Sequence, residues 1–192
     1  MTRKADLDLD ITTLLPRLGD AWHPVNPKKP KRHVGIDGGR TVGLAMSVSR
    51  KMVIVDSGPF FWALETLADL ALYDSEATAQ EVGPLVVHIE DPDKIGHVYS
   101  ASEQQLSKGG LINMAAVRRA MKIAQDVGRV KETTRLIERW ARIMEARGLV
   151  SEVRLVRPST SKWDADTFRM FTRWEGQTNE HARDAAKLVV GL

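Results

Sequence analysis

The feature that most constrains the fold of this chain is the stretch 33–48, in which an acidic residue lies between two apolar segments. Two β-branched apolar residues lie just before Asp37, a glycine pair follows it, and alternating apolar residues then resume. β-branched residues favour a buried strand and glycines permit a tight reversal, so the stretch predicts a hairpin with Asp37 ending its first strand. A carboxylate fixed there is suited to anchor a metal ion. The structural alternative is an Asp-Gly turn whose carboxylate bonds only nearby amides.

Length and composition favour a single globular domain. The 192 residues are 43% hydrophobic, enough to bury a sizeable core. With 28 Lys and Arg against 25 Asp and Glu, the formal net charge of +3 permits nucleic-acid binding without establishing it. The absence of cysteine excludes disulfides and thiolate metal sites. Because we find neither an N-terminal signal nor an apolar run of about 18 residues, we expect a cytoplasmic protein without a membrane partner.

Residues 1–32 are expected to form an extension that ends in a basic, proline-rich linker, ahead of one domain over residues 33–192. Three prolines and four cations lie within residues 24–32. The prolines prevent regular structure there. The cations indicate either a clamp for backbone phosphates or a solvated linker.

The order of the predicted elements indicates an α/β fold. After the hairpin, residues 51–57 continue an antiparallel meander of three strands. The apolar run 85–90, reached through a helix, is typical of a buried parallel strand, and residues 153–156 form the fifth strand. Helices are expected at residues 60–72, 111–127, 130–147, 165–174 and 179–190. The sequence thus predicts a mixed five-stranded sheet, three antiparallel strands followed by parallel strands, flanked by helices. Gly128, between two of the helices, is expected to be a joint or a point of close packing.

Three acidic residues and one histidine lie where these elements can bring them together. Glu90 ends an apolar strand, and a buried acid there requires a partner. His181 and Asp184 are three residues apart and project from one face of the last helix, toward the strand end that carries Asp37. Crowded carboxylates repel one another unless a cation joins them, and Mg²⁺ or Mn²⁺ prefers such ligands. Taken singly, His181 also fits a surface or capped histidine, and Asp184 an acid on a helix surface.

Basic side chains that follow the second acidic strand are candidate contacts to phosphate. Lys108 lies in a polar loop, and Arg118, Arg119 and Lys122 begin a row that the next predicted helix continues. Such rows indicate either a solvated helix face or a track for DNA. In the same helices, Trp140 belongs to an apolar stripe and is expected in the core.

Three segments together resemble the RuvC-type Holliday-junction resolvases, most closely the phage-borne branch. They are Val34-Gly35-Ile36-Asp37-Gly38-Gly39, Val87-His88-Ile89-Glu90 and Glu180-His181-Ala182-Arg183-Asp184-Ala185-Ala186. The resemblance implies a ribonuclease-H-like fold, with Asp37, Glu90, His181 and Asp184 as the metal-binding catalytic set for two Mg²⁺ or Mn²⁺ ions and no small-molecule cofactor. In that set Asp37 would bridge the ions, and Glu90 and Asp184 would hold one each. His181 would position or deprotonate the attacking water.

The resemblance also implies a substrate and a partner. Members of the family act as homodimers that cut two strands of a four-way junction symmetrically and leave 5′-phosphate ends. Here the dimer contact would lie within residues 111–147, Lys108 would touch the DNA, and Lys162 would lie near the scissile phosphate.

Two departures from the family keep other functions open. The family usually begins almost at its first strand, whereas this chain begins with the extension, and the loop after Glu90 offers only Tyr99 as an aromatic residue. One alternative is a ribonuclease-H-like nuclease that acts on RNA–DNA hybrids, forks or flaps. The other is a non-catalytic protein that binds junctions.

Overall fold

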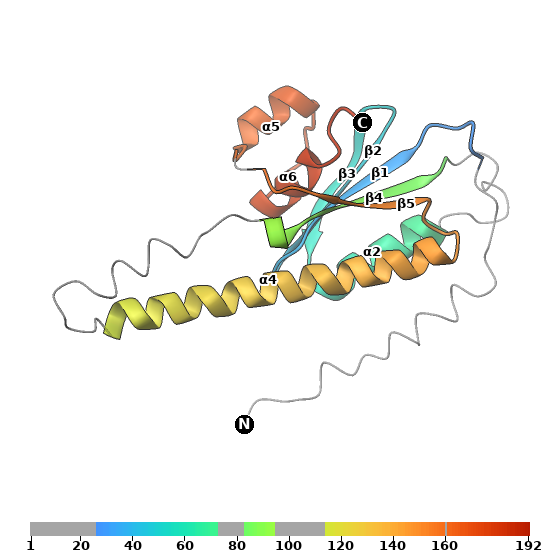
Figure 1. Ribbon diagram of the computed structural model, residues 1–192. Coiled ribbons are helices and arrows are strands. Elements are labelled where there is room, and N and C mark those ends of the chain that lie inside the picture. The colour runs from blue at the N-terminus through green and yellow to red at the C-terminus, as the bar shows by residue number, and fades with distance from the viewer. Residues whose placement is uncertain (1–25, 73–82, 95–113, 160) are drawn as a thin grey trace.

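A mixed sheet with helices on both faces forms the centre of the protein, as the computed structural model shows in Figure 1. The structure describes residues 26–72, 83–94, 114–159 and 161–192, with residues 92 and 114–120 described in their backbone alone. The strands are β1 Arg32–Asp37, β2 Val42–Val48, β3 Lys51–Gly58, β4 Leu85–Glu90 and β5 Glu152–Val156. The helices are α2 Phe60–Leu72, η2 Pro92–Lys94, α4 Met114–Ala146, α5 Ala165–Thr172 and α6 Glu180–Lys187.

The sheet has the predicted mixed topology. Its five strands lie in the order β3-β2-β1-β4-β5. The first three strands of the chain pair antiparallel, and β4 and β5 add parallel to β1 in turn. The prediction of an α/β fold with antiparallel strands followed by parallel strands is therefore confirmed, and this topology is compatible with a ribonuclease-H-like fold.

Alternating side chains of β1 and β2 serve two different layers. Val34 and Ile36 are fully buried in the core formed with α2 and α4 on one face of the sheet. On the opposite face the sheet presents small residues such as Ala45, which packs with the alanines of α6 and with Phe168 of α5. The two layers of helices on either side of the sheet are visible in Figure 1. Asp37 belongs to the second face, where it meets α6.

Two glycines let α6 approach the sheet at backbone distance. A Cβ on Gly35 would lie 2.2 Å from the carbonyl oxygen of Ala185. A Cβ on Gly43 would lie 1.9 Å from the carbonyl oxygen of His181. Real Cβ atoms do not come so close to other atoms, so any larger residue at either position would push the helix outward. Because neither glycine has a side chain, the backbone of α6 can lie directly against the sheet.

The long helix α4 replaces the two helices expected on either side of Gly128. The prediction of a joint there is wrong because one glycine weakens a helix by only about 1 kcal/mol and keeps its place in the hydrogen-bond ladder. A Cβ on Gly128 would meet no other part of the protein within 4 Å, so close packing does not explain the glycine either.

Trp140 is 1% exposed, in the core as predicted. Among the described helices, none is both long and apolar enough to cross a lipid bilayer.

Arg32 belongs to the sheet and not to a phosphate clamp in the linker. Its side chain is buried, and its guanidinium donates hydrogen bonds to the carbonyl oxygens of Leu70 and Gly83. Leu70 lies in the last turn of α2, where backbone carbonyls lack partners within the helix. The arginine therefore joins β1 to α2, and its charge is turned inward. Residues 1–25 of the predicted extension lie outside the described residues.

Alanine at Gly43 is expected to destabilise the protein, whereas alanine at Gly128 is expected to stabilise it. The Cβ of Gly43→Ala would collide with backbone and displace α6, lowering the free energy of unfolding by about 1–3 kcal/mol. Gly128→Ala only removes the entropic disadvantage of glycine in a helix, about 0.5–1 kcal/mol. Urea denaturation of both variants measures the two effects. Equal stability of the two variants would contradict the close seating of α6.

Candidate active site

The ends of β1 and β4 place Asp37 and Glu90 side by side. The strands are parallel neighbours, and their register pairs Ile36 with Ile89, the residues just before the two acids. Asp37 is 8% exposed and Glu90 is half-buried. The two carboxyl groups lie within hydrogen-bonding reach of each other. A hydrogen bond between them requires a proton on one of them, and the raised pKa of Glu90 makes it the carboxyl that would donate.

Both acids hold protons more tightly than exposed carboxyls do. Burial raises the pKa of Glu90 to about 7, and the hydrogen bond with Asp37 and the negative charges of Asp37 and Asp184 contribute in the same direction. Burial also raises the pKa of Asp37, while its hydrogen bond with His181 opposes that shift. The physical cause is negative charge held in a partly dry site without enough positive charge beside it.

The first turn of α6 brings His181 onto Asp37. Its Nδ1 lies 3.0 Å from Oδ2 of Asp37, across 144 positions in the sequence. Asn179 caps the helix by accepting a hydrogen bond from the amide of Ala182, and its side chain also bonds Ser57 of β3. These contacts fix the start of α6 against the sheet. The imidazole contacts Asp37 on one side, yet 43% of the side chain is exposed, so solvent reaches the ring.

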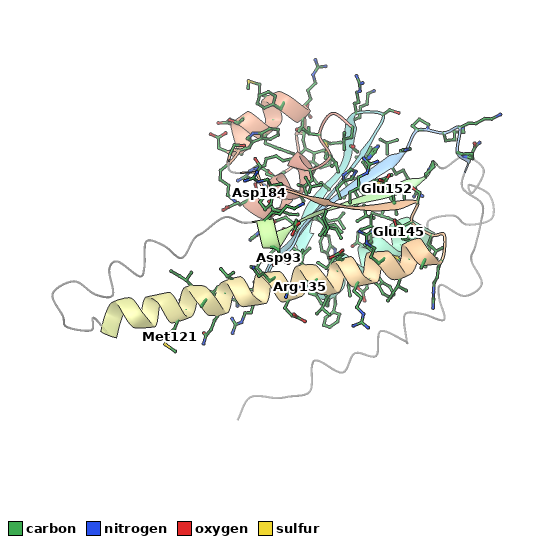
Figure 2. The ribbon with its side chains drawn as sticks, viewed as in Figure 1. Asp93, Met121, Arg135, Glu145, Glu152 and Asp184 are labelled. Atoms are coloured by element: carbon green, nitrogen blue, oxygen red, sulfur yellow. The ribbon has the colours of Figure 1, made fainter. Side chains whose placement is uncertain are left out.

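Asp184, one turn further along α6, is neutralised by two lysines. Lys162 contacts one carboxylate oxygen at 2.5 Å, and Lys187 contacts the other at 2.9 Å. Although burial opposes the shift, these hydrogen bonds lower the pKa of Asp184. Its negative charge still raises the pKa values of Asp37 and Glu90, so the three acids lie within electrostatic reach of one another. Figure 2 shows Asp184 among the side chains of the α6 layer.

The segment that carries Lys162 is attached to α6 by further contacts. The guanidinium of Arg183 donates to the carbonyl oxygen of Trp163 at 2.9 Å, and the ammonium of Lys187 donates to that of Ser161. Lys162 also contacts Glu180 at 2.7 Å. The salt bridges with Asp184 and Glu180 raise the pKa of Lys162 against the effect of burial, so the group stays charged.

Of the other basic residues expected to bind DNA, none reaches this cluster among the described side chains. Lys108 lies outside the described residues, and only the backbone of Arg118 and Arg119 is described, within α4. Lys122 is exposed and follows Met121, which lies on the part of α4 that extends past the sheet (Figure 2). Further along α4, Arg135 pairs with Asp93, which is consistent with a solvated helix face (Figure 2).

The donor set fits a divalent cation at Asp37 and Glu90. These carboxyls are adjacent and their pKa values are raised, and a cation between them would supply the positive charge that the site lacks. Within the described residues, no three or more acids and histidines are gathered closely enough to surround one ion together. Asp184 would have to release at least one lysine to become a ligand. The four-ligand, two-ion arrangement therefore stays a prediction.

Lys187 is a residue of this site that sequence reasoning missed. Its side chain is 7% exposed, and the signal that identifies it is its spacing of three residues from Asp184 on the same helix. The Asp-Gly turn offered as an alternative for Asp37 does not describe its contacts, because the carboxylate meets two side chains distant in sequence, those of His181 and Glu90.

Comparisons of the chain with family models, with curated proteins and with solved structures find no match.

Without divalent ions, the thermal stability of the protein is expected to fall relative to that of Glu90→Gln as the pH rises from about 5 to about 8. Glu90 has a pKa of about 7 in the folded state and its ordinary value of 4.5 in the unfolded chain, so the folded state binds the proton more strongly. Raising the pH removes that proton and the stability linked to it. Thermal unfolding in EDTA measures the effect.

The comparison with Glu90→Gln is needed because His88 titrates nearby with the opposite sign. Burial lowers the pKa of His88 from 6.5 to about 4, so its contribution to stability is lost as the pH falls through that range. At about pH 8, Mg²⁺ or Mn²⁺ is expected to raise the unfolding midpoint of the unaltered protein and to change that of Glu90→Gln little. Parallel pH curves and no effect of either ion would contradict the site.

Proposed function

We propose that the protein is a divalent-metal-dependent endodeoxyribonuclease that resolves four-way (Holliday) and other branched DNA junctions by phosphodiester hydrolysis. The observation that carries this proposal is the meeting of Asp37, Glu90 and His181 at one end of the sheet, with Asp184 within electrostatic reach. The fold brings these residues together from two strands and a distant helix, although their carboxylates repel one another. A ribonuclease-H-like fold of the RuvC type supplies the same order of strands and ligands.

In this proposal the four side chains hold two Mg²⁺ or Mn²⁺ ions. When bound, such ions activate water and stabilise the leaving oxygen of a phosphodiester. Asp37 orients the imidazole of His181 through the contact at Nδ1, and the exposed part of the ring is free to orient a water molecule or accept its proton. Lys162, with 64% of its side chain exposed beside Asp184, is placed to neutralise a phosphate.

Helix α4 supports the proposed homodimer. It has 33 residues and is therefore about 50 Å long, and its N-terminal part extends past the sheet (Figure 1). Met121 on that part is 60% exposed, and Ile123 is 38% exposed (Figure 2). No described side chain is buried between Met121 and Thr133. A single helix of this length gains little stability in water by itself, so burial against a second copy would stabilise it.

Asp37→Asn is expected to reduce cleavage of a synthetic four-way junction by about 100-fold or more while leaving junction binding intact. The amide keeps the shape of the side chain and removes the negative charge on which ion binding depends. Gel assays of cleavage with Mg²⁺, and of binding in EDTA, measure the two properties separately. The matched control is Asp69→Asn, an exposed acid on α2 across the sheet, which should cut normally. Undiminished cutting by Asp37→Asn would contradict the mechanism.

The choice of substrate separates the proposed activity from its alternatives. At equal concentration, the protein is expected to cut a four-way junction at paired, symmetric positions in preference to a fork, a flap or an RNA–DNA hybrid. Preferential cutting of the hybrid or the fork would favour a ribonuclease-H-like nuclease of different specificity. Tight junction binding with no cutting in Mg²⁺ or Mn²⁺ would favour the non-catalytic protein.

A further inference from the structure

Helix α5 presents an exposed aromatic surface beside the candidate active site. Phe171 is 60% exposed and Met170 is 70% exposed, whereas Phe168 on the inner side of the helix is 1% exposed and packs against α6. The ring of Phe171 stacks on that of half-buried Trp163, with centroids 5.1 Å apart and planes inclined by 21°. We call Trp163, Met170 and Phe171 the aromatic shelf.

The aromatic shelf is tied to the residues of the candidate site. Trp163 directly follows Lys162, whose ammonium contacts Asp184. The carbonyl oxygen of Trp163 accepts a hydrogen bond from Arg183, the neighbour of Asp184 on α6. Trp163 also contacts the buried ring of Phe168, with centroids 6.4 Å apart. The shelf is therefore held by the same helix that carries His181 and Asp184, and its exposed ring lies on a fixed support.

The charges around the shelf suit a nucleic acid better than a lipid tail. The two acids at the start of α5 are already engaged, because Asp164 caps the helix and Asp166 pairs with Arg169. At the other end of α5, Arg173 is exposed in a left-handed turn. Arg173 therefore adds positive charge just after the turn that carries Phe171. Lys162, next to Trp163, is paired with Asp184 and Glu180, but its side chain is 64% exposed, so a phosphate can still approach it. A nucleobase between two phosphates has the complementary pattern.

We propose that the aromatic shelf is a stacking surface for an unpaired nucleobase of the DNA substrate. This inference rests on the proposed function, because it takes the strand near Lys162 to be the one that is cut. A base inside a duplex is already stacked on both faces, whereas a base at a branch point or in a single strand lacks a neighbour. The exposed face of Phe171 supplies that neighbour, so the shelf favours branched over continuous duplex DNA.

The test compares Phe171→Ala with Phe61→Ala. Phe61 is the matched control, since it is an exposed phenylalanine on α2, away from the shelf. The probes are a fluorescently labelled four-way junction and a linear duplex with the sequence of its arms, titrated in EDTA. Phe171→Ala is expected to raise the dissociation constant for the junction roughly tenfold and to leave that for the duplex unchanged, since one stacked base contributes about that much. Phe171→Tyr should retain the affinity, and Phe61→Ala should match the unaltered protein.

Several outcomes would overturn the inference. Equal junction affinity of Phe171→Ala and the unaltered protein would do so, as would an equal loss on junction and duplex. A change from dimer to monomer on sedimentation of Phe171→Ala would show that the shelf is an interface between copies instead. Because Phe171 is exposed, unfolding is not expected, and an unchanged thermal midpoint verifies this.

A parallel cleavage assay of the unaltered protein in Mg²⁺ separates this inference from the proposed function. If the protein cuts the junction and Phe171→Ala binds it normally, the shelf is contradicted and the nuclease stands. If the protein binds the junction without cutting it and Phe171→Ala binds it roughly tenfold more weakly, the shelf is supported and the nuclease is contradicted.

Discussion

The close contact between α6 and the sheet is the interaction on which the candidate site depends. Gly35 and Gly43 leave no side chain between the strands and the backbone of α6, and the alanines of the helix match them from the other side. Only at that depth does His181, in the first turn, reach Asp37 at 3.0 Å. The glycines that look like features of a turn or a strand in the sequence are therefore what sets the geometry of the site.

The negative charges of the candidate site must be balanced for its three acids to lie so close together. The excess negative charge is relieved in two ways, by the raised pKa of Glu90, which favours its protonated form, and by the two lysines on Asp184. Both are replaceable, because a proton leaves as the pH rises and Lys162 is largely exposed. A divalent cation would compete with both. This connects the raised pKa values with the proposed chemistry: the groups that lack a positive charge are those proposed to bind one.

The sequence predicted the fold better than the site. The spans 60–72 and 85–90 agree with the structure because local apolar patterns define them. The joint expected at Gly128 failed because a single glycine does not overcome a long helical pattern. The lysine contacts of Asp184 and the inward turn of Arg32 were missed, since they depend on which distant residues fold against each side chain. Composition identifies such charges but not their partners.

Asp37 and Glu90 are proposed to bind a divalent cation at the meeting point of β1, β4 and α6. Anomalous X-ray scattering from crystals of the protein grown with Mn²⁺ would locate that ion. We expect an anomalous peak within coordination distance of both carboxylates, about 2.0–2.3 Å from their oxygens. A well-ordered site with Asp37 and Glu90 still hydrogen-bonded to each other, and no peak between them at saturating Mn²⁺, would contradict it.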